Sequence, residues 1–233
     1  MNHILCLETS TDICSVALFN EGNLVSFRET KEKNAHSARL TVMIDELMQE
    51  AGLDYKGLSA VAISKGPGSY TGLRIGAGVA KGLCYATQIP LIAVSTLESI
   101  AYEVAHQIEG MEWEKTPVIV PMIDARRMEV YKAIYDACGQ QLKDVEAEII
   151  HENSFQSFDC PIILAGDGAA KCRPLFYDNP QIIFMDNILA SARWMGPIAQ
   201  RKLAEGEIEN TAYFEPFYLK DFIAGIPKVK GLK

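Results

Sequence analysis

The stretch Lys65-Gly66-Pro67-Gly68-Ser69-Tyr70-Thr71-Gly72-Leu73-Arg74-Ile75-Gly76 joins an apolar run at 58–63 to a segment with helical spacing. Its first two glycines allow backbone angles that other residues avoid, and the proline between them stiffens the turn. Ser69 or Thr71 is suited to cap the free amides of the helix that follows. The stretch therefore predicts a rigid strand-to-helix loop whose N–H groups can hold an anion or a partner's carboxylate. A tight turn with a purely structural role is the alternative.

The spacing of apolar residues around this loop predicts an alternating series of strands and helices. In order, the predicted elements are strands at 3–7, 13–19 and 24–29, a helix at 38–48, a strand at 58–63, a helix at 72–86, a strand at 91–94 and a helix that begins at the capping box Ser95-Thr96-Leu97-Glu98. Three antiparallel strands followed by right-handed crossovers are typical of a ribonuclease-H-like half.

A polar segment at 110–116 separates this half from a second series of elements. The second series has predicted strands at 118–123, 130–135, 145–150, 162–165 and 182–185, and an amphipathic helix at 190–204. The element order approximately repeats, and two such halves side by side give the α/β architecture of actin-like ATPases and sugar kinases, the ASKHA fold. We predict an N-terminal half at 1–109, a C-terminal half at 110–220 and a flexible tail at 221–233.

The composition favours a cytoplasmic protein that does not bind nucleic acid tightly on its own. The 233 residues are 48% hydrophobic and carry a formal net charge of −8, so a partner must supply most of any contact with a polyanion. Neither a secretory signal nor a membrane span is predicted. The cysteines form no Cys-x-x-Cys pair and are expected to be reduced, within apolar strands or helices. They are Cys6, Cys14, Cys84, Cys138, Cys160 and Cys172.

No catalytic or metal site is predicted. The four histidines have neither a second histidine four residues away nor a neighbouring cysteine or carboxylate at ligand spacing. Ser69 follows a glycine, but Thr71 stands where a nucleophile elbow needs its second glycine. A Ser–His–Asp set cannot be argued from the pattern.

Two strand-end loops are candidates for a nucleotide phosphate. Thr9-Ser10-Thr11 follows the first strand but contains no glycine, and the strand before it ends in Glu8. Gly166-Asp167-Gly168 is a glycine turn after the strand at 162–165. An ordinary turn and helix start is the favoured alternative for both, since neither matches the P-loop pattern. We predict no cofactor, and binding of ATP or ADP is left open.

The helix at 72–86 contains two pairs of glycines spaced by four, Gly72 with Gly76 and Gly78 with Gly82. Each interior glycine costs about 1 kcal/mol relative to alanine, so a close backbone approach is expected to offset it. One pair is expected to face the sheet and the other a partner helix, with the methionine-rich helix at 40–48 sharing that surface. Core packing is the alternative for the methionines. The predicted partner interface comprises Met43, Leu47, Gly72, Arg74, Ile75, Gly76, Val79 and Gly82.

Asp124, Arg126 and Arg127 end the strand at 118–123. Arginine pairs well with carboxylate or phosphate, so these residues are candidates for recognition. An internal ion pair of an arginine with Asp124 or Glu129 is the alternative. The C-terminal tail has Lys220, Lys228, Lys230 and Lys233 against only Asp221. Its expected state is a solvated, mobile end, and contact with RNA or an acidic partner is the alternative.

Together, these motifs resemble the bacterial TsaB (YeaZ) family over nearly the full chain. Besides the glycine stretch they are Leu7-Glu8-Thr9-Ser10-Thr11, Cys14-Ser15-Val16-Ala17-Leu18, His36-Ser37-Ala38-Arg39-Leu40, Ile123-Asp124-Ala125-Arg126-Arg127 with Glu129-Val130-Tyr131, Gly166-Asp167-Gly168 and Glu215-Pro216-Phe217-Tyr218-Leu219-Lys220. The family usually has arginine where Lys220 stands, and Glu8 also departs from its pattern, which weakens an inherited nucleotide site.

The resemblance implies an accessory subunit for the synthesis of threonylcarbamoyladenosine in tRNA. The family's catalytic paralogue, TsaD, has a metal-binding His-x-x-x-His where Thr96 and Ile100 stand here, which implies a non-enzymatic role. The implied partners are a TsaD-like paralogue, a TsaE-like ATPase, a second copy when the paralogue is absent, and tRNA indirectly through the complex. The rival hypotheses are a stand-alone ATPase or sugar kinase of the same fold, and a peptidase, as the family's older glycoprotease label suggests.

Overall fold

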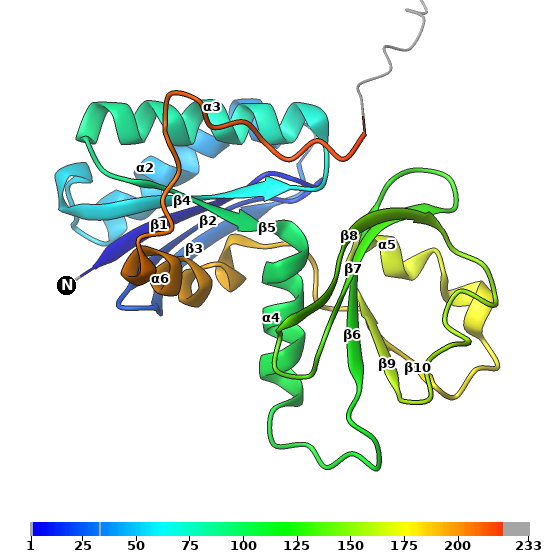
Figure 1. The fold of residues 1–233 in the computed structure, drawn as a ribbon. Coiled ribbons are helices and arrows are strands. Elements are labelled where there is room, and N and C mark those ends of the chain that lie inside the picture. Colours follow the sequence, from blue (N-terminus) through cyan, green and yellow to red (C-terminus); the bar gives the residue numbers. More distant parts are fainter. Residues whose placement is uncertain (1, 33, 221–233) are drawn as a thin grey trace, which may run out of the picture.

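The computed structural model describes residues 2–32 and 34–220, so the predicted tail at 221–233 lies outside the described residues. The chain forms two lobes, each built on a mixed five-stranded sheet (Figure 1). This arrangement confirms the predicted α/β architecture of two similar halves. No helix in the described part of the chain has the length and apolar character that crossing a bilayer requires.

The first sheet has the strand order β3-β2-β1-β4-β5. Its strands are β1 (His3–Glu8), β2 (Cys14–Asn20), β3 (Asn23–Thr30), β4 (Leu58–Gly66) and β5 (Leu91–Ser95). The first three strands pair antiparallel, and β4 and β5 add in parallel. Glu21 and Gly22 join β2 to β3 with φ values of 51° and 80°, as a tight hairpin between twisted strands requires.

Helices α2 (Leu40–Glu50) and α3 (Tyr70–Thr87) cover one face of this sheet. The predicted helix at 38–48 is divided, because a short helix α1 (Ala35–Ala38) precedes α2 and Arg39 separates them. A 3-10 turn, η1 (Tyr55–Gly57), leads into β4. The predicted cap of α3 is confirmed: the Gly72 amide donates to Ser69 Oγ at 3.3 Å. The predicted capping box at Ser95 is wrong, because that side chain makes no capping hydrogen bond.

The second sheet has the strand order β10-β9-β6-β7-β8. Its strands are β6 (Val118–Asp124), β7 (Glu129–Tyr135), β8 (Gln141–Ile149), β9 (Ile162–Ala165) and β10 (Ile182–Met185). Helix α4 (Thr96–Ile108) packs its apolar stripe on one face of this sheet. The short helix α5 (Asp167–Ala170), the 3-10 turn η2 (Arg173–Phe176) and the segment at 150–158 cover the other face. Every predicted strand of this half is present.

The last helical segment returns to the first sheet. The predicted helix at 190–204 consists of a 3-10 turn, η3 (Ala192–Trp194), and helix α6 (Gly196–Glu205). Both pack on the face of the first sheet opposite to α2 and α3, where α6 buries Ile198 and Ala199. The Ala192 amide also donates to Ser15 Oγ on β2 at 2.9 Å. The prediction placed the whole range 110–220 in the second half, whereas the structure completes the first half with this segment.

Residues 207–220, here called the C-terminal strap, run from α6 past α3 to the second lobe (Figure 1). The Glu209 amide donates to Leu91 O at 2.8 Å, and the Phe217 amide donates to Lys65 O at 2.7 Å. Between them, Lys81 Nζ on α3 donates to two strap carbonyls, at 3.0 and 3.2 Å. The strap is therefore fixed along its length and ends beside the glycine loop.

The cysteines are only partly where the sequence predicts them. Cys6 and Cys14 lie in strands and Cys84 lies in α3, whereas Cys138, Cys160 and Cys172 lie in turns. All are free thiols, and only Cys138 is fully exposed. Burial raises the pKa of Cys84 to about 11, so its thiol is unreactive at neutral pH.

The two glycine pairs of α3 face opposite environments. A Cβ at Gly72 would lie 2.0 Å from Thr9 O, and one at Gly76 would lie 2.3 Å from Thr9 Oγ1. Gly78 and Gly82 have open space where a Cβ would be. The expectation that the pairs divide between the chain's own sheet side and another surface is therefore confirmed for the first pair, and the second pair faces outward.

We expect alanine to have opposite effects at the two glycine pairs. Gly78→Ala should raise the free energy of unfolding by up to about 1 kcal/mol, because alanine is the better helix former and meets no atom. Gly72→Ala should lower it by roughly 1–3 kcal/mol, because the new Cβ overlaps a backbone oxygen. Urea unfolding of both variants measures the difference. Equal stabilities would contradict the close contact of α3 with Thr9.

Candidate functional site

The glycine loop at 66–69 rests directly on the loop that follows β1. The Ser69 amide donates to Ser10 O at 2.6 Å, and a Cβ at Gly68 would lie 2.2 Å from the same oxygen. The peptide bond between Gly66 and Pro67 is cis. The Ser69 and Gly72 amides, which the sequence offers to an anion, are thus taken by the chain itself. At these two amides the loop serves to pack α3 on the first sheet.

The loop at 9–11 is closed by the carboxyl group of Glu8. Glu8 is fully buried, and its Oε1 accepts the Ser10 amide at 2.7 Å and Ser64 Oγ at 2.7 Å. The Ser10 amide points to the chain's own carboxyl and not to an external anion. Among the described residues, Glu8 Oε2, Thr9 Oγ1 and Ser10 Oγ have no hydrogen-bond partner.

Burial raises the pKa of Glu8, and the hydrogen bonds from Ser10 and Ser64 offset that shift only in part. The low-dielectric surroundings penalise the charged form, so the folded chain favours the protonated carboxyl more than the unfolded chain does. The two hydrogen bonds to Oε1 offset part of the cost of placing an acidic side chain in the core of the first lobe.

The second candidate loop, 166–168, packs on the end of β6. Gly166 has a φ of 97°, and a Cβ there would lie 2.2 Å from Met122 O, so only glycine fits. Asp167 Oδ1 accepts the Asp124 amide at 3.0 Å. Burial raises the pKa of Asp167, and the hydrogen bond from the Asp124 amide offsets part of that shift. The negative charges of Asp124 and of Asp12, a residue of the first lobe, raise the pKa further. Nucleotide binding by these loops stays a prediction.

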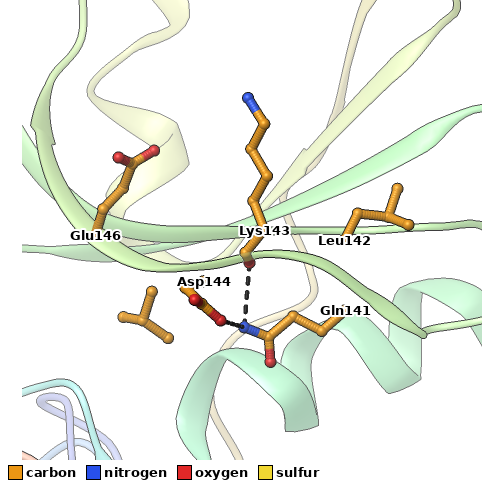
Figure 2. A pocket seen from close by; sticks show the side chains of 6 residues that line it. Gln141, Leu142, Lys143, Asp144 and Glu146 are labelled. Atoms are coloured by element: carbon orange, nitrogen blue, oxygen red, sulfur yellow. Dashed lines mark hydrogen bonds between the residues drawn. The ribbon is translucent and has the colours of Figure 1, made fainter.

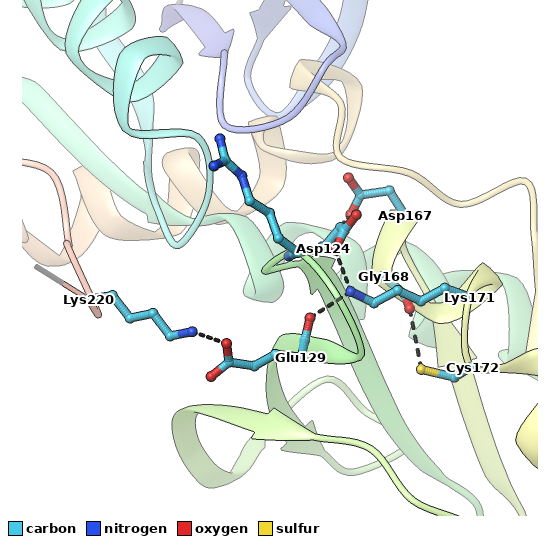
Figure 3. Close-up of polar contacts among 8 residues, drawn as sticks. Asp124, Glu129, Asp167, Gly168, Lys171, Cys172 and Lys220 are labelled. Atoms are coloured by element: carbon cyan, nitrogen blue, oxygen red, sulfur yellow. Dashed lines mark hydrogen bonds and ion pairs between the residues drawn. The ribbon is translucent and has the colours of Figure 1, made fainter. Parts of the chain in front are cut away.

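The β6–β7 hairpin of the second lobe takes part in a network of ion pairs (Figure 3). Lys171 Nζ pairs with Asp124 Oδ1 and donates to Glu129 O at 2.6 Å. Lys220, at the end of the strap, pairs with Glu129 Oε2. The carboxylates that were the alternative partners of the hairpin arginines are therefore taken by lysines.

Arg126 and Arg127 form the tip of this hairpin, both with left-handed backbone, at φ values of 71° and 54°. Both side chains are exposed, and within the described residues neither has an ion-pair partner. The backbone bends tightly because the Arg126 amide donates to Asp124 Oδ1 at 2.8 Å. The hairpin thus presents two unpaired guanidinium groups to a carboxylate or phosphate from outside.

Half of the predicted partner interface is core. Met43 and Leu47 are buried between α2 and the sheet, while Gly72 and Gly76 contact Thr9. Apolar spacing on α2 cannot tell a core face from an interface face, and here the core explains it. Arg74 is exposed, Ile75 and Val79 are half-buried, and Gly82 is open.

The predicted interface left out Gly78, although the sequence analysis paired it with Gly82, and the sequence analysis missed two further surface residues on the same two helices, Tyr85 and Val42. Gly78 is open, and Tyr85 on α3 and Val42 on α2 are 79% and 40% exposed. Their spacing from Gly82 along α3 could have indicated Gly78 and Tyr85, because residues three or four apart share a helix face.

The other places that could hold a ligand or a metal lie away from the loops at 9–11 and 166–168. The hollow drawn in Figure 2 is lined by six consecutive residues of β8, Gln141 to Glu146, and contains none of the loop residues. Across residues 2–32 and 34–220, no cluster of three or more His, Cys, Asp or Glu side chains could hold a metal ion. Thr96 and Ile100 are buried at the start of α4.

We expect Glu8→Gln to stabilise the chain at neutral and alkaline pH. Because the folded pKa is raised, the folded chain binds more protons than the unfolded chain between the two pKa values, and the free energy of unfolding falls as pH rises through that window. Glutamine keeps the acceptor for Ser10 and Ser64 without the charge. Chemical unfolding at about pH 4 and about pH 8 should show the gain only at the higher pH. The exposed Glu152→Gln is the control, and a gain that does not depend on pH would contradict the assignment.

The sequence of this chain is similar to a known family model and to named proteins. The family model described as TsaD, tRNA N6-adenosine threonylcarbamoyltransferase, matches residues 29–228. The tRNA threonylcarbamoyladenosine biosynthesis protein TsaB of Escherichia coli strain K12 is 32% identical over 232 residues, which is 95% of this chain and 96% of that protein.

Solved structures agree. YeaZ from Pseudomonas aeruginosa is similar with a TM-score of 0.76 at 30% identity, over 94% of this chain and 100% of that one. A polyphosphate/ATP-glucomannokinase from Arthrobacter shares only 10% identity but has a TM-score of 0.50 over 88% of this chain and 100% of its own, which supports the ASKHA fold alone. Because a relative at 32% identity matches over nearly its full length, the chain belongs to the TsaB (YeaZ) family.

Proposed function

We propose that the chain is a non-catalytic dimerisation subunit of a tRNA N6-adenosine threonylcarbamoyltransferase complex. It would support a TsaD-like catalytic paralogue in transferring the threonylcarbamoyl group to the adenosine beside the anticodon. The observation that carries this proposal is the match, over 95% of the chain, to a protein named for the biosynthesis of that modified nucleoside. A cytoplasmic location follows from this role, because the tRNA substrate is there.

A non-enzymatic role is supported by the hydrogen bonds that the two loops make within the chain. The Ser10 amide and the Ser69 amide, which could otherwise contact a phosphate, donate to Glu8 and to Ser10 within the chain. Thr96 and Ile100 occupy the positions that the resemblance aligns with the paralogue's metal-binding histidines, and both are buried. Neither side chain is a usual ligand for zinc or iron. The chain would therefore contribute by binding, with the chemistry left to its partner.

The outer face of α3 is the surface that we assign to the paralogue. Gly78 and Gly82 are open on this face, and the half-buried Val79 lies between them. Glycines that lack internal contacts still cost helix stability, and a backbone that approaches closely would offset this cost. Tyr85 lies one turn further along the same face, and 79% of its surface is exposed. When the paralogue is absent, the same face would pair with a second copy, since one self-complementary patch gives a two-fold dimer.

Other members of the complex follow from the family. A TsaE-like ATPase would join the complex, and tRNA would bind mainly through the assembled surface. The net charge of −8 supports this division, since an acidic subunit repels a polyanion unless cations are gathered locally.

The proposal predicts a sharp result in a reconstituted reaction. The chain alone should leave tRNA unmodified, and the paralogue with its other partners should lose most of its modification rate when the chain is omitted. Incorporation of labelled threonine into tRNA measures both. Full modification by the chain alone would disprove the non-catalytic role.

The α3 surface is tested separately by Gly82→Leu. The variant should keep its fold, because leucine favours helix and the site is open, and should bind the paralogue at least tenfold more weakly. Ala204→Leu, at an exposed position on α6, is the matched control and should bind normally. Light scattering and titration of the two proteins measure the association. Normal binding by Gly82→Leu would remove this face from the interface.

A stand-alone ATPase or sugar kinase is the second candidate, because the chain shares the fold of a polyphosphate/ATP-glucomannokinase and has Asp167 in a glycine turn at a strand end. The filled amide of Ser10 argues against it. We expect the purified chain to turn over no ATP, whether or not magnesium and a panel of sugars are present. Steady release of phosphate that is lost on substitution of Asp167 would instead support an ATPase or sugar kinase.

A further inference from the structure

We propose that the chain itself contacts RNA, by stacking an unpaired nucleotide on a patch formed by Lys65, Tyr70, Arg74, Phe217 and Tyr218. This inference rests on the proposed function, and it adds a direct contact that the function does not require. The patch lies where the C-terminal strap meets the glycine loop and the first turns of α3. The strap continues from there to Lys220, which pairs with Glu129 at the β6–β7 hairpin (Figure 3).

The aromatic rings of the patch are arranged as a platform. The centroids of Tyr70 and Tyr218 are 4.9 Å apart with an angle of 42° between the rings. Arg74 also contacts Tyr70, since its Nη1 donates to the Tyr70 hydroxyl at 2.7 Å and its guanidinium lies 5.3 Å from the ring centroid. The rings are thus fixed before any ligand arrives, which lowers the entropy lost on binding.

The platform is exposed although it is aromatic. Phe217 and Tyr218 have 41% and 38% of their surfaces in contact with solvent. The strap backbone around them is anchored by the Phe217 amide, so these rings are not part of a loose end. Two adjacent exposed aromatic residues on a fixed backbone leave apolar surface in water, and a ligand with a planar face would cover it.

A hollow of about 570 Å3 adjoins the platform. Its lining includes the rings of Tyr213, Phe217 and Tyr218, with Lys65, Glu209 and Glu215 among the polar groups. A nucleobase has matching properties, because its faces stack and its edge carries both donors and acceptors. The two carboxylates in the lining disfavour a phosphate inside the hollow and suit an exocyclic amino group.

Two cations of the patch are available for the phosphate that follows the base. Most lysines and arginines of the described residues pair with a carboxylate, including Lys220 with Glu129. Lys65 and Arg74 have no such partner in the described part of the chain, on a protein with a net charge of −8. Unpaired cations beside a stacking surface favour a single-stranded nucleic acid over an uncharged aromatic ligand.

The single hollow and its two neighbouring cations favour an unpaired nucleotide over a base-paired one. In a duplex the faces of the bases are covered by their neighbours, and a single hollow beside two cations cannot follow a long run of phosphates. A loop whose bases can turn outward meets both demands. A tRNA offers such bases in its loops, which connects the patch to the proposed function.

The test measures binding of a labelled ten-nucleotide oligoadenylate by fluorescence anisotropy, with the full chain alone and in complex with the paralogue. Tyr218→Ala should weaken binding about five- to 100-fold, the range that follows from losing one stacked base. Tyr218→Phe keeps the ring and should bind within about twofold of the wild type, as should Tyr177→Ala, whose ring is 86% exposed in the second lobe. Arg74→Ala should weaken binding and reduce its dependence on salt.

Three results would overturn the inference. Tyr218→Ala could bind the oligonucleotide as the wild type does, inorganic polyphosphate could compete as well as RNA does, or the wild type could fail to bind. Lys65→Ala provides a variant outside the strap, in case Tyr218→Ala disturbs the strap, and it should also weaken binding. The proposed function is judged separately: modification that still depends on the chain without RNA binding would remove only this inference, and RNA binding without support of modification would remove only the function.

Discussion

The close contact between α3 and the loop after β1 is the constraint on which the rest of the structure depends. Backbone oxygens of Thr9 and Ser10 lie where the Cβ atoms of Gly72 and Gly68 would be, so the chain can meet itself here only with glycine. The contact fixes the first turn of α3, the direction of its outer face and the position of Tyr70. In the loop after β1, the Ser69 amide donates to Ser10 O, and the Ser10 amide and Ser64 Oγ donate to Glu8. The same region thus uses these two amides within the chain and sets the direction in which α3 leaves the loop.

The sequence was sufficient for most of the fold and for the family. Strands β9 and β10 begin and end at their predicted residues, because short apolar runs between polar turns leave little choice of register. Of the two predicted caps of α3, Ser69 and Thr71, the structure selects Ser69, because the helix begins at Tyr70 and Thr71 lies inside it. By contrast, Ser95 has the spacing of a capping box but its hydroxyl is buried without a capping bond, because local spacing does not report tertiary surroundings.

The candidate site was less predictable, because it depends on contacts between residues that are far apart in the sequence. Met43 and Leu47 have the same spacing as an interface stripe, yet they lie against the sheet. The glycine pairs look alike in sequence, and only the approach of Thr9 separates the inner pair from the outer one. Lysines from distant segments, Lys171 and Lys220, take the carboxylates near the hairpin arginines, which no spacing rule could indicate. The packing of α6 on the first sheet, between segments far apart in the chain, was hidden in the same way.

The return of α6 has a consequence for how the protein is made. One face of the first sheet, including Ile4 and Phe19, packs against η3 and α6, which come later in the chain than every strand of the second sheet. A nascent chain that has emerged up to residue 190 therefore leaves the part of this apolar face that η3 and α6 cover in contact with solvent and with other nascent chains. Such a surface is a binding site for chaperones and a risk for aggregation. The lobe that begins first is thus completed only after the second sheet has been made.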